Sequence, residues 1–291
     1  MTAEDRISVL PCWSGPVDIA PLSGGMTNRN YLVTDAAKRF VVRLGEDLPA
    51  HGVMRFNELA AARAAHLAGV SPEVVYAGPG VMVSRFIEGR TLEPADLRAL
   101  PRLPALVGLL QRCHQEIPKF LRGPALMFWV FQVLRDYVAL LREIPGHLLE
   151  QDLPRLVTMA RQLEAAVGPV DIVFCHNDLL AANFVDDGRR LWLIDWDYAG
   201  FNTPLFDLAN LSSSNQFSRE HDHALLERYF QTAPGPTRLR EFEALKCASM
   251  LREGLWSAVS HSTSTIRLDY AGYTRTWLER LDLAWREYAG A

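Results

Sequence analysis

The sequence has no apolar run long enough to cross a membrane. Its longest stretch without Asp, Glu, Lys or Arg is Gly254–Ile266, which is 13 of the 291 residues. A spanning helix needs about 20 predominantly apolar residues. Glu4, Asp5 and Arg6 stand where an export signal would need its apolar segment. We therefore expect neither membrane insertion nor export.

The sequence also lacks a cysteine pattern and a basic excess. Cys12, Cys113, Cys175 and Cys247 lie far apart, with no Cys-X-X-Cys pair and no Cys/His ligand spacing. The 30 Lys and Arg residues against 34 Asp and Glu residues give a net charge of −4, whereas a nucleic-acid or anionic-membrane binder needs a basic excess. These absences predict reduced thiols, a cytoplasmic location and no nucleic-acid partner.

What is present predicts a globular protein with two lobes. The hydrophobic content of 49% suffices for a large core, and at roughly 150 residues per domain the length favours about two units. Residues 1–88 are typical of short strands around one helix. The expected strands are Val17–Leu22, Asn30–Val33, Phe40–Leu44, Glu73–Ala77 and Val81–Ile87, and the expected helix is Arg55–Ala68. This order predicts an antiparallel sheet with one helix packed on it.

Residues 89–291 predict a larger, mostly helical lobe, so the fold class is α+β. The expected helices are Pro94–Gln115, Leu126–Arg142, Leu153–Val167, Arg219–Gln231, Arg238–His261 and Arg267–Tyr288. Their composition and apolar periodicity favour helix. A group of short strands interrupts them at Asp171–Cys175, Ala182–Val185 and Leu191–Ile194.

This central strand group carries polar residues at a regular spacing. His176, Asp178 and Asn183 form the pattern HxDxxxxN, and Asp195 follows the next strand. A turn with Asp178 at one end and Asn183 at the other aims both side chains into one cleft, and the next strand brings Asp195 beside Asn183. Two oxygen ligands of this kind suit Mg²⁺, and Asp178 then faces an attacking hydroxyl as a base or orienting group. A lone DxxxxN is usually a solvated loop, but two matched halves on apolar strands favour a site.

These segments resemble the catalytic loop and the metal-binding segment of the aminoglycoside phosphotransferase and choline/ethanolamine kinase superfamily. The resemblance covers nearly the whole chain and implies a two-lobed, protein-kinase-like fold. It implies that Asp178 is the catalytic aspartate and that Asn183 and Asp195 are Mg²⁺ ligands. It also implies that His176 is structural and that Asp207 braces the catalytic loop.

The first lobe has a glycine-containing turn and a strand cation that fit this resemblance. Two glycines in the Ser23–Gly25 turn let the backbone approach a phosphate closely, although an ordinary hairpin turn has the same composition. By the resemblance, Arg43 stands where protein kinases and aminoglycoside enzymes have a lysine that reaches the phosphates, and Glu58 is its helix partner. An arginine at this position resembles the choline-kinase branch. A surface Arg–Glu pair is the alternative. The expected ATP-binding residues of the 1–88 lobe are Ser23, Gly24, Gly25, Asn28, Arg43 and Glu58.

Two segments near the C-terminus resemble the end of choline kinases. Gly254–Ser257 reads GLWS, and a YxxY segment ends at Tyr273. In that family such segments build an aromatic box for trimethylammonium, a soft cation that ring faces and nearby carboxylates hold well. The resemblance makes Trp256 and Tyr273 box walls, with Asp178 and Asp197 supplying negative potential. Aromatic residues at helical spacing are also typical of an ordinary core.

One residue departs from the choline-kinase pattern. Those enzymes carry an aromatic residue three positions before the tryptophan, where this chain has Glu253. A carboxylate facing the box favours a cation with N–H donors, such as ethanolamine, over a fully methylated one. Pairing with Arg252 or Arg267 would instead keep Glu253 from the substrate.

Together these patterns predict an ATP- and Mg²⁺-dependent kinase that phosphorylates a cationic amino alcohol, choline or ethanolamine. Thiamine and aminoglycosides are alternatives on the same scaffold. A non-catalytic nucleotide-binding module or a quaternary-amine sensor is the alternative from another class. Degenerate kinases generally lose residues of the Asp178 and Asp195 type, and both are present here.

Overall fold

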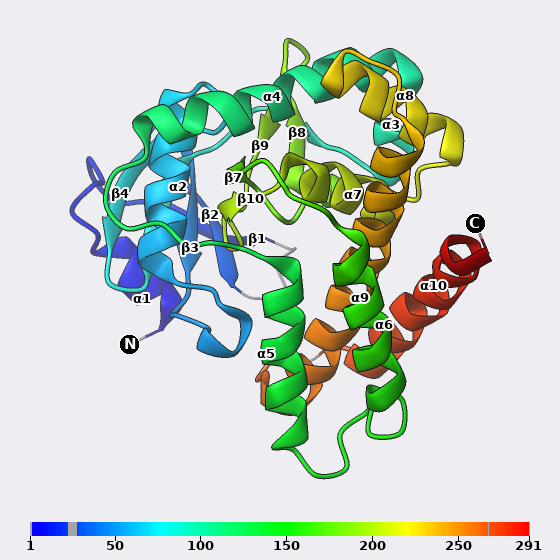
Figure 1. The fold of residues 1–291 in the computed structure, drawn as a ribbon. Coiled ribbons are helices and arrows are strands. Elements are labelled where there is room, and N and C mark those ends of the chain that lie inside the picture. The colour runs from blue at the N-terminus through cyan, green and yellow to red at the C-terminus, as the bar shows by residue number, and fades with distance from the viewer. Residues whose placement is uncertain (1, 23–27, 267, 291) are drawn as a thin grey trace.

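The computed structural model describes residues 2–22, 28–266 and 268–290 and has two lobes. Figure 1 shows strands and one long helix on one side, a larger helical lobe on the other, and short strands between them. The predicted α+β, two-lobed fold is confirmed. The boundary after residue 88 stays a prediction.

Five antiparallel strands form the sheet of the first lobe, in the order β1-β2-β3-β5-β4. They are β1 (Asp18–Leu22), β2 (Arg29–Asp35), β3 (Lys38–Leu44), β4 (Val74–Gly78) and β5 (Val81–Arg85). Burial alternates along β2 and β3 because successive side chains point to opposite faces. One face packs Val33 and Val42 with Ile7 of the short helix α1 (Ala3–Ser8), which the sequence did not predict. The other face turns Arg43 toward the second lobe.

Helix α2 (Arg55–Leu67) lies close to α4 (Leu103–Phe120) because small side chains face it. Ala61 and Ala65 are fully buried in the larger core. Gly69 follows the helix with φ of +70°, a left-handed conformation that favours glycine and ends helices. The helix predicted over Arg55–Ala68 is confirmed to within one residue.

The second lobe is built around α9 (Pro236–Thr263), which contacts α5, α6, α7 and α10. The remaining helices of the lobe are α3 (Pro94–Leu97), α5 (Val130–Arg142), α6 (Leu153–Ala166), α7 (Pro204–Asn215), α8 (Arg219–Phe230) and α10 (Tyr270–Gly290). The 3₁₀ turns are η1 (Pro49–His51), η2 (Leu100–Arg102) and η3 (Ala181–Asn183). None of the helices in the described residues is long and apolar enough to cross a bilayer.

Prolines and tertiary contacts move some helix limits. The stretch predicted as one helix over Pro94–Gln115 divides into α3, η2 and α4, because Pro101 and Pro104 cannot continue a helix and instead open the next one. Helix α5 begins at Val130 rather than Leu126, since the preceding residues run extended and Met127 bridges to the strand that contains Phe201.

Helix α7 was not predicted. All twelve of its residues are buried, so its sequence has no exposed polar face and no amphipathic period. Its start carried a readable signal, because the Thr203 side chain caps the first turn and Pro204 follows at the position that favours proline.

The central strands lead into the polar residues of the site. The predicted ones are β7 (Val173–Cys175), β8 (Phe184–Asp186) and β9 (Leu191–Leu193), and two more, β6 (Arg90–Thr91) and β10 (Gly200–Asn202), are too short to show a pattern in the sequence. Strand β10 pairs with β7, and β8 lies between β6 and β9.

Candidate active site

A cavity of about 470 Å³ lies between the two lobes. The pairing register places Asn30, Arg43 and Met82 side by side on β2, β3 and β5, and all three line it. The lining from the second lobe includes Asp178, Asn183, Asp195, Asp197, Tyr198, Arg252, Glu253 and Trp256. Most of the predicted site residues within the described ranges therefore meet in one cavity. Ser23, Gly24 and Gly25 lie outside the described residues.

The loop after β7 is held by Asp207 of α7. This fully buried carboxylate accepts hydrogen bonds from the backbone N–H groups of His176 (2.9 Å) and Asn177 (2.7 Å). The His114 ring lies 3.0 Å from the same carboxylate. Burial alone would raise the pKa of Asp207, but these contacts bring it below its usual value. Asp207 therefore braces this loop, and the catalytic role of the loop stays a prediction.

Two further amides of α7 fix the same loop. The backbone N–H of Leu179 donates to Asn210 Oδ1 (2.5 Å), and Asn215 Nδ2 donates to the Leu179 carbonyl (2.9 Å). His176 packs its ring on Trp196 and lies 2.9 Å from the Ile194 carbonyl, so it ties the loop to the segment after β9. A structural role for His176 agrees with these contacts.

Asp178 lies at the start of the loop, between a helix cation and an amide. Its Oδ1 is 3.4 Å from Arg252 Nη1, and its Oδ2 is 3.4 Å from Asn183 Nδ2. Burial raises the pKa of Asp178 to about 7, which nearby Arg252 opposes and the charges of Glu253 and Asp195 support. A carboxylate with this basicity is suited to accept a proton from a hydroxyl near neutral pH.

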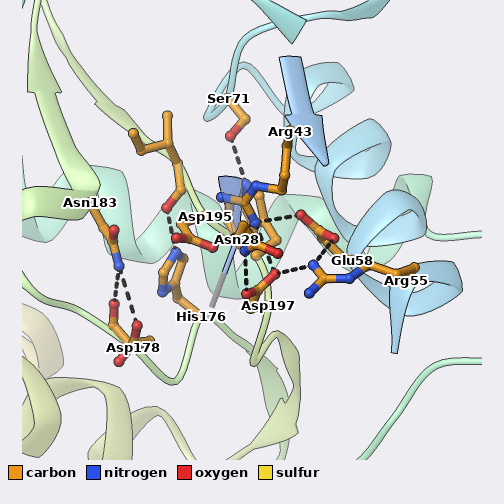
Figure 2. Close-up of polar contacts among 12 residues, drawn as sticks. Asn28, Arg43, Arg55, Glu58, Ser71, His176, Asp178, Asn183, Asp195 and Asp197 are labelled. Carbon is orange, nitrogen blue, oxygen red and sulfur yellow. Dashed lines mark hydrogen bonds and ion pairs between the residues drawn. The ribbon is translucent and has the colours of Figure 1, made fainter. Parts of the chain in front are cut away.

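Asn183 and Asp195 offer oxygen ligands on the same side of the cavity. The amide nitrogen of Asn183 donates to the Asp178 carbonyl (2.8 Å), which leaves the amide oxygen as the ligand atom. Figure 2 shows this nitrogen pointing at Asp178 and the oxygen pointing away. The backbone N–H of Ile194 donates to the Asn183 carbonyl (2.9 Å) and so joins the two segments. An amide oxygen beside a carboxylate fits Mg²⁺, which prefers oxygen ligands.

Arg43 is the centre of an ionic cluster at the sheet face of the cavity (Figure 2). Its Nη1 lies 2.5 Å from Glu58 Oε1 and 2.9 Å from one oxygen each of Asp195 and Asp197. Arg55 adds a second guanidinium, 2.6 Å from Glu58 and 2.8 Å from Asp197. Burial raises the pKa of Glu58 despite both arginines. The predicted pair of Arg43 and Glu58 is confirmed and belongs to a larger network.

Of the two predicted aromatic box residues, Trp256 lines the cavity and Tyr273 does not. The Trp256 ring on α9 lies 6.0 Å from the Tyr273 ring and 5.5 Å from the His51 ring. Glu253 accepts a hydrogen bond from the Tyr273 hydroxyl (3.0 Å) and forms an ion pair with its neighbour Arg252. The pairing with Arg252, one of the two alternatives for Glu253, is therefore present, and Glu253 still lines the cavity.

The geometry of this cavity agrees with comparisons to known proteins. Residues 18–242 match the phosphotransferase enzyme family. The chain belongs to that family. This phosphotransferase is 30% identical over 278 residues to protein LicA of Haemophilus influenzae, an alignment covering 90% of this chain and 78% of that protein. A probable ethanolamine kinase of Arabidopsis thaliana is 28% identical, with 87% and 75% of the two chains covered.

A solved structure extends the likeness to the fold. The choline/ethanolamine kinase family protein from Mesorhizobium loti is 29% identical and superposes with a TM-score of 0.76, covering 97% of this phosphotransferase and 93% of that chain. The resemblance on which the sequence predictions relied is confirmed. So is the predicted enzyme class, a phosphotransferase with an alcohol group as acceptor.

Asp197 lines the cavity, and its contact with a substrate stays a prediction. That prediction gave its charge to a cationic substrate, but its carboxylate lies between Arg43 and Arg55, and Asn28 Nδ2 donates to it (2.9 Å). Arg43 and Arg55 share their charge between Asp197 and Glu58, and Arg43 also pairs with Asp195. The same contact places Asn28 beside the ionic cluster.

Two arginines of the site were not predicted. Arg55 lies one helical turn before Glu58 on α2, a spacing that places both on one face and was visible in the sequence. Arg252 had no comparable signal, because an arginine beside a glutamate on a helix usually lies at the surface.

The uncharged ring of His51 joins the two lobes. We predict that this buried histidine makes the free energy of unfolding smaller in mild acid. Its ring lies 3.1 Å from Ser260 Oγ and 3.3 Å from the Tyr137 hydroxyl, and burial together with the charge of Arg252 lowers its pKa from 6.5 to about 4. Below its ordinary pKa, histidine takes up a proton in the unfolded chain but not in the fold. The free energy of unfolding therefore falls as the pH drops from 6.5 toward 4, with about 2 kcal/mol lost at pH 5.

The measurement is urea unfolding at pH 7.5 and pH 5 for the wild type and His51→Gln. The glutamine variant is expected to lack this component of the acid loss, while the exposed control His223→Gln on α8 keeps it. Equal losses in the wild type and His51→Gln would contradict the prediction.

Proposed function

We propose that this phosphotransferase is an ATP- and Mg²⁺-dependent kinase that transfers the γ-phosphate to the hydroxyl of a cationic amino alcohol, choline or ethanolamine. One observation carries the proposal: Arg43 and Asp195, Asp178, and Trp256 with Glu253 all line a single cavity. Donor phosphate, acceptor hydroxyl and amine then each have a group that suits them.

The sheet side of the cavity supports the nucleotide. The guanidinium of Arg43 suits phosphate oxygens and is fixed by its partner Glu58. Val41, Met82 and Ser84 line the same side and offer a mostly apolar surface for a base. Asn28 and the residues of the preceding glycine turn stay our prediction for phosphate contact.

In the proposed reaction, Asp178 accepts the proton of the acceptor hydroxyl. The hydroxyl oxygen then forms a bond to the γ-phosphorus of ATP, and ADP leaves. The Asp178 carboxylate is 16% exposed, and its pKa of about 7 makes it basic enough for this step. When bound by Asn183 and Asp195, Mg²⁺ supplies charge neutralisation for the phosphate oxygens. Arg43 holds the remaining phosphate charge.

Trp256 and Glu253 in the cavity lining support a cationic acceptor. Ring faces attract a soft ammonium group, and Trp256 presents a large ring with the Glu253 carboxylate one helical turn before it. Both oxygens of Glu253 already accept from Arg252 and Tyr273. Glu253 is therefore only partly available to an N–H donor, and choline and ethanolamine both remain within the proposal.

The test is ADP release with choline, ethanolamine, thiamine or an aminoglycoside as acceptor. We expect turnover with choline or ethanolamine, and its loss when EDTA removes Mg²⁺. Turnover with only thiamine or only the aminoglycoside would contradict choline and ethanolamine as substrates and identify that compound as the acceptor. Nucleotide binding without ADP release for any acceptor would favour a non-catalytic module.

Trp256 is expected to control affinity for the acceptor. Trp256→Leu keeps an apolar side chain but removes the ring face, so KM for the amino alcohol should rise by roughly 10- to 30-fold, as expected for about 2 kcal/mol of cation–π attraction. KM for ATP should stay within about twofold, because the proposed nucleotide residues Arg43 and Glu58 are untouched. Trp256→Phe, which keeps a ring face, should lose less. Equal KM values for Leu and Phe variants would show that Trp256 serves only the core.

A further inference from the structure

Arg252 is a buried cation beside the proposed catalytic carboxylate. Its side chain is 2% exposed and is the largest of the fully buried side chains in the described ranges. Burying a guanidinium is expensive unless close partners compensate it. An apolar residue could fill position 252 of α9, yet this position carries a charge. We therefore expect a role of Arg252 beyond packing.

The partners of Arg252 fix both its charge and its orientation. Glu253 forms an ion pair with Nη1, and the Tyr273 hydroxyl donates to the other Glu253 oxygen (3.0 Å). The guanidinium carbon lies 4.5 Å from the centre of the Tyr198 ring, so the planar group lies over an aromatic face. Its Nη1 therefore has a defined position near Asp178.

The carboxylate of Asp178 is held from two sides. Arg252 Nη1 lies 3.4 Å from Oδ1, and Asn183 Nδ2 lies 3.4 Å from Oδ2. A carboxylate near one donor can rotate about its side-chain bonds, whereas donors at both oxygens restrict it. Without Arg252, Asn183 would be the one side chain among the described residues that still holds this carboxylate.

We propose that Arg252 is a positioning residue that orients the Asp178 carboxylate toward the acceptor hydroxyl, and that Glu253 and Tyr273 hold Arg252 in place. The inference rests on the proposed function, because it assigns Asp178 as the proton acceptor. It makes Tyr273, Glu253, Arg252 and Asp178 one chain of contacts that leads to the reacting hydroxyl.

The test uses the double variant Arg252→Met/Glu253→Gln, which removes both charges and avoids leaving Glu253 buried without its partner. We expect it to fold, with kcat lowered by about 100-fold, the size of effect that a misplacement of about 1 Å can produce. KM for ATP should stay within about twofold, because Arg43 is untouched. Arg252→Lys keeps the charge without the planar fork, so its kcat should lie between those of the wild type and the double variant.

Lys246→Met is the matched control on the same helix. Lys246 also forms a largely buried ion pair, with Asp222 (2.6 Å), but it lies away from the cavity. This control should lower the melting temperature and leave kcat unchanged. If the double variant does not fold, Arg252→Lys carries the test.

The possible failures are distinct. A wild-type protein that releases no ADP with any acceptor contradicts the proposed function. An active wild type whose kcat is unchanged in the double variant or, where that variant does not fold, in Arg252→Lys overturns the role of Arg252. A kcat that falls only in proportion to the fraction of folded protein also overturns it.

Discussion

Replacing Asp178 by asparagine should lower kcat by about 1000-fold, within the range expected for loss of a proton-accepting group. Asparagine has the same shape but cannot accept the hydroxyl proton. The hydrogen bond from Asn183 Nδ2 to the backbone carbonyl of residue 178 does not involve the side chain and should survive. The measurement is ADP release at saturating ATP and amino alcohol, together with nucleotide affinity, which should change little.

Asp171→Asn provides the control for Asp178→Asn. Asp171 is exposed and lies just before β7, outside the cavity. Its substitution by asparagine makes the same chemical change as Asp178→Asn, so kcat should be unaffected. Full turnover by Asp178→Asn would show that another group accepts the proton.

The second large effect is expected for Arg43→Met. Arg43 is 12% exposed and contacts three carboxylates, of which Arg55 also pairs with Glu58 and Asp197. Removing one partner of a buried ionic network typically costs about 3–5 kcal/mol, because the remaining charges stay buried without compensation. We expect a loss of this size in the free energy of unfolding, measured with urea, and a large increase in KM for ATP.

Arg39→Met on the same strand separates this effect from a general loss of charge. Arg39 pairs with Glu88 at the surface, where the side chains are 41% and 67% exposed, so its removal should cost less than about 1 kcal/mol. If both variants lost the same stability, the buried network would not be a source of stability.

The sequence predicted those parts of the site whose function depends on local spacing. Asp178, Asn183 and Asp195 are placed by two short strands and a turn, so their distances along the chain determine where they meet. The pair of Arg43 and Glu58 was also accessible, because the strand and helix that carry it are close neighbours in the chain.

Contacts between distant segments could not be predicted in this way. The partners of Asp197 come from the first lobe, more than 140 residues earlier, and no local pattern indicates that two arginines reach it. Helix α7 was missed because complete burial removes the period by which a helix is recognised. Arg252 was missed as a site residue because an arginine beside a glutamate is typical of the exposed face of a helix.

The sharing of Arg43 among three carboxylates has a consequence for how a phosphate group enters the cavity. Glu58, Asp195 and Asp197 already occupy one guanidinium nitrogen. An incoming phosphate therefore competes with internal anions, and its binding is an exchange in which Asp195 and Asp197 give up contacts with Arg43. A cation that binds Asp195 makes that exchange easier, because it compensates the Asp195 charge in place of Arg43. Phosphate and metal should then enter cooperatively, each raising the affinity for the other.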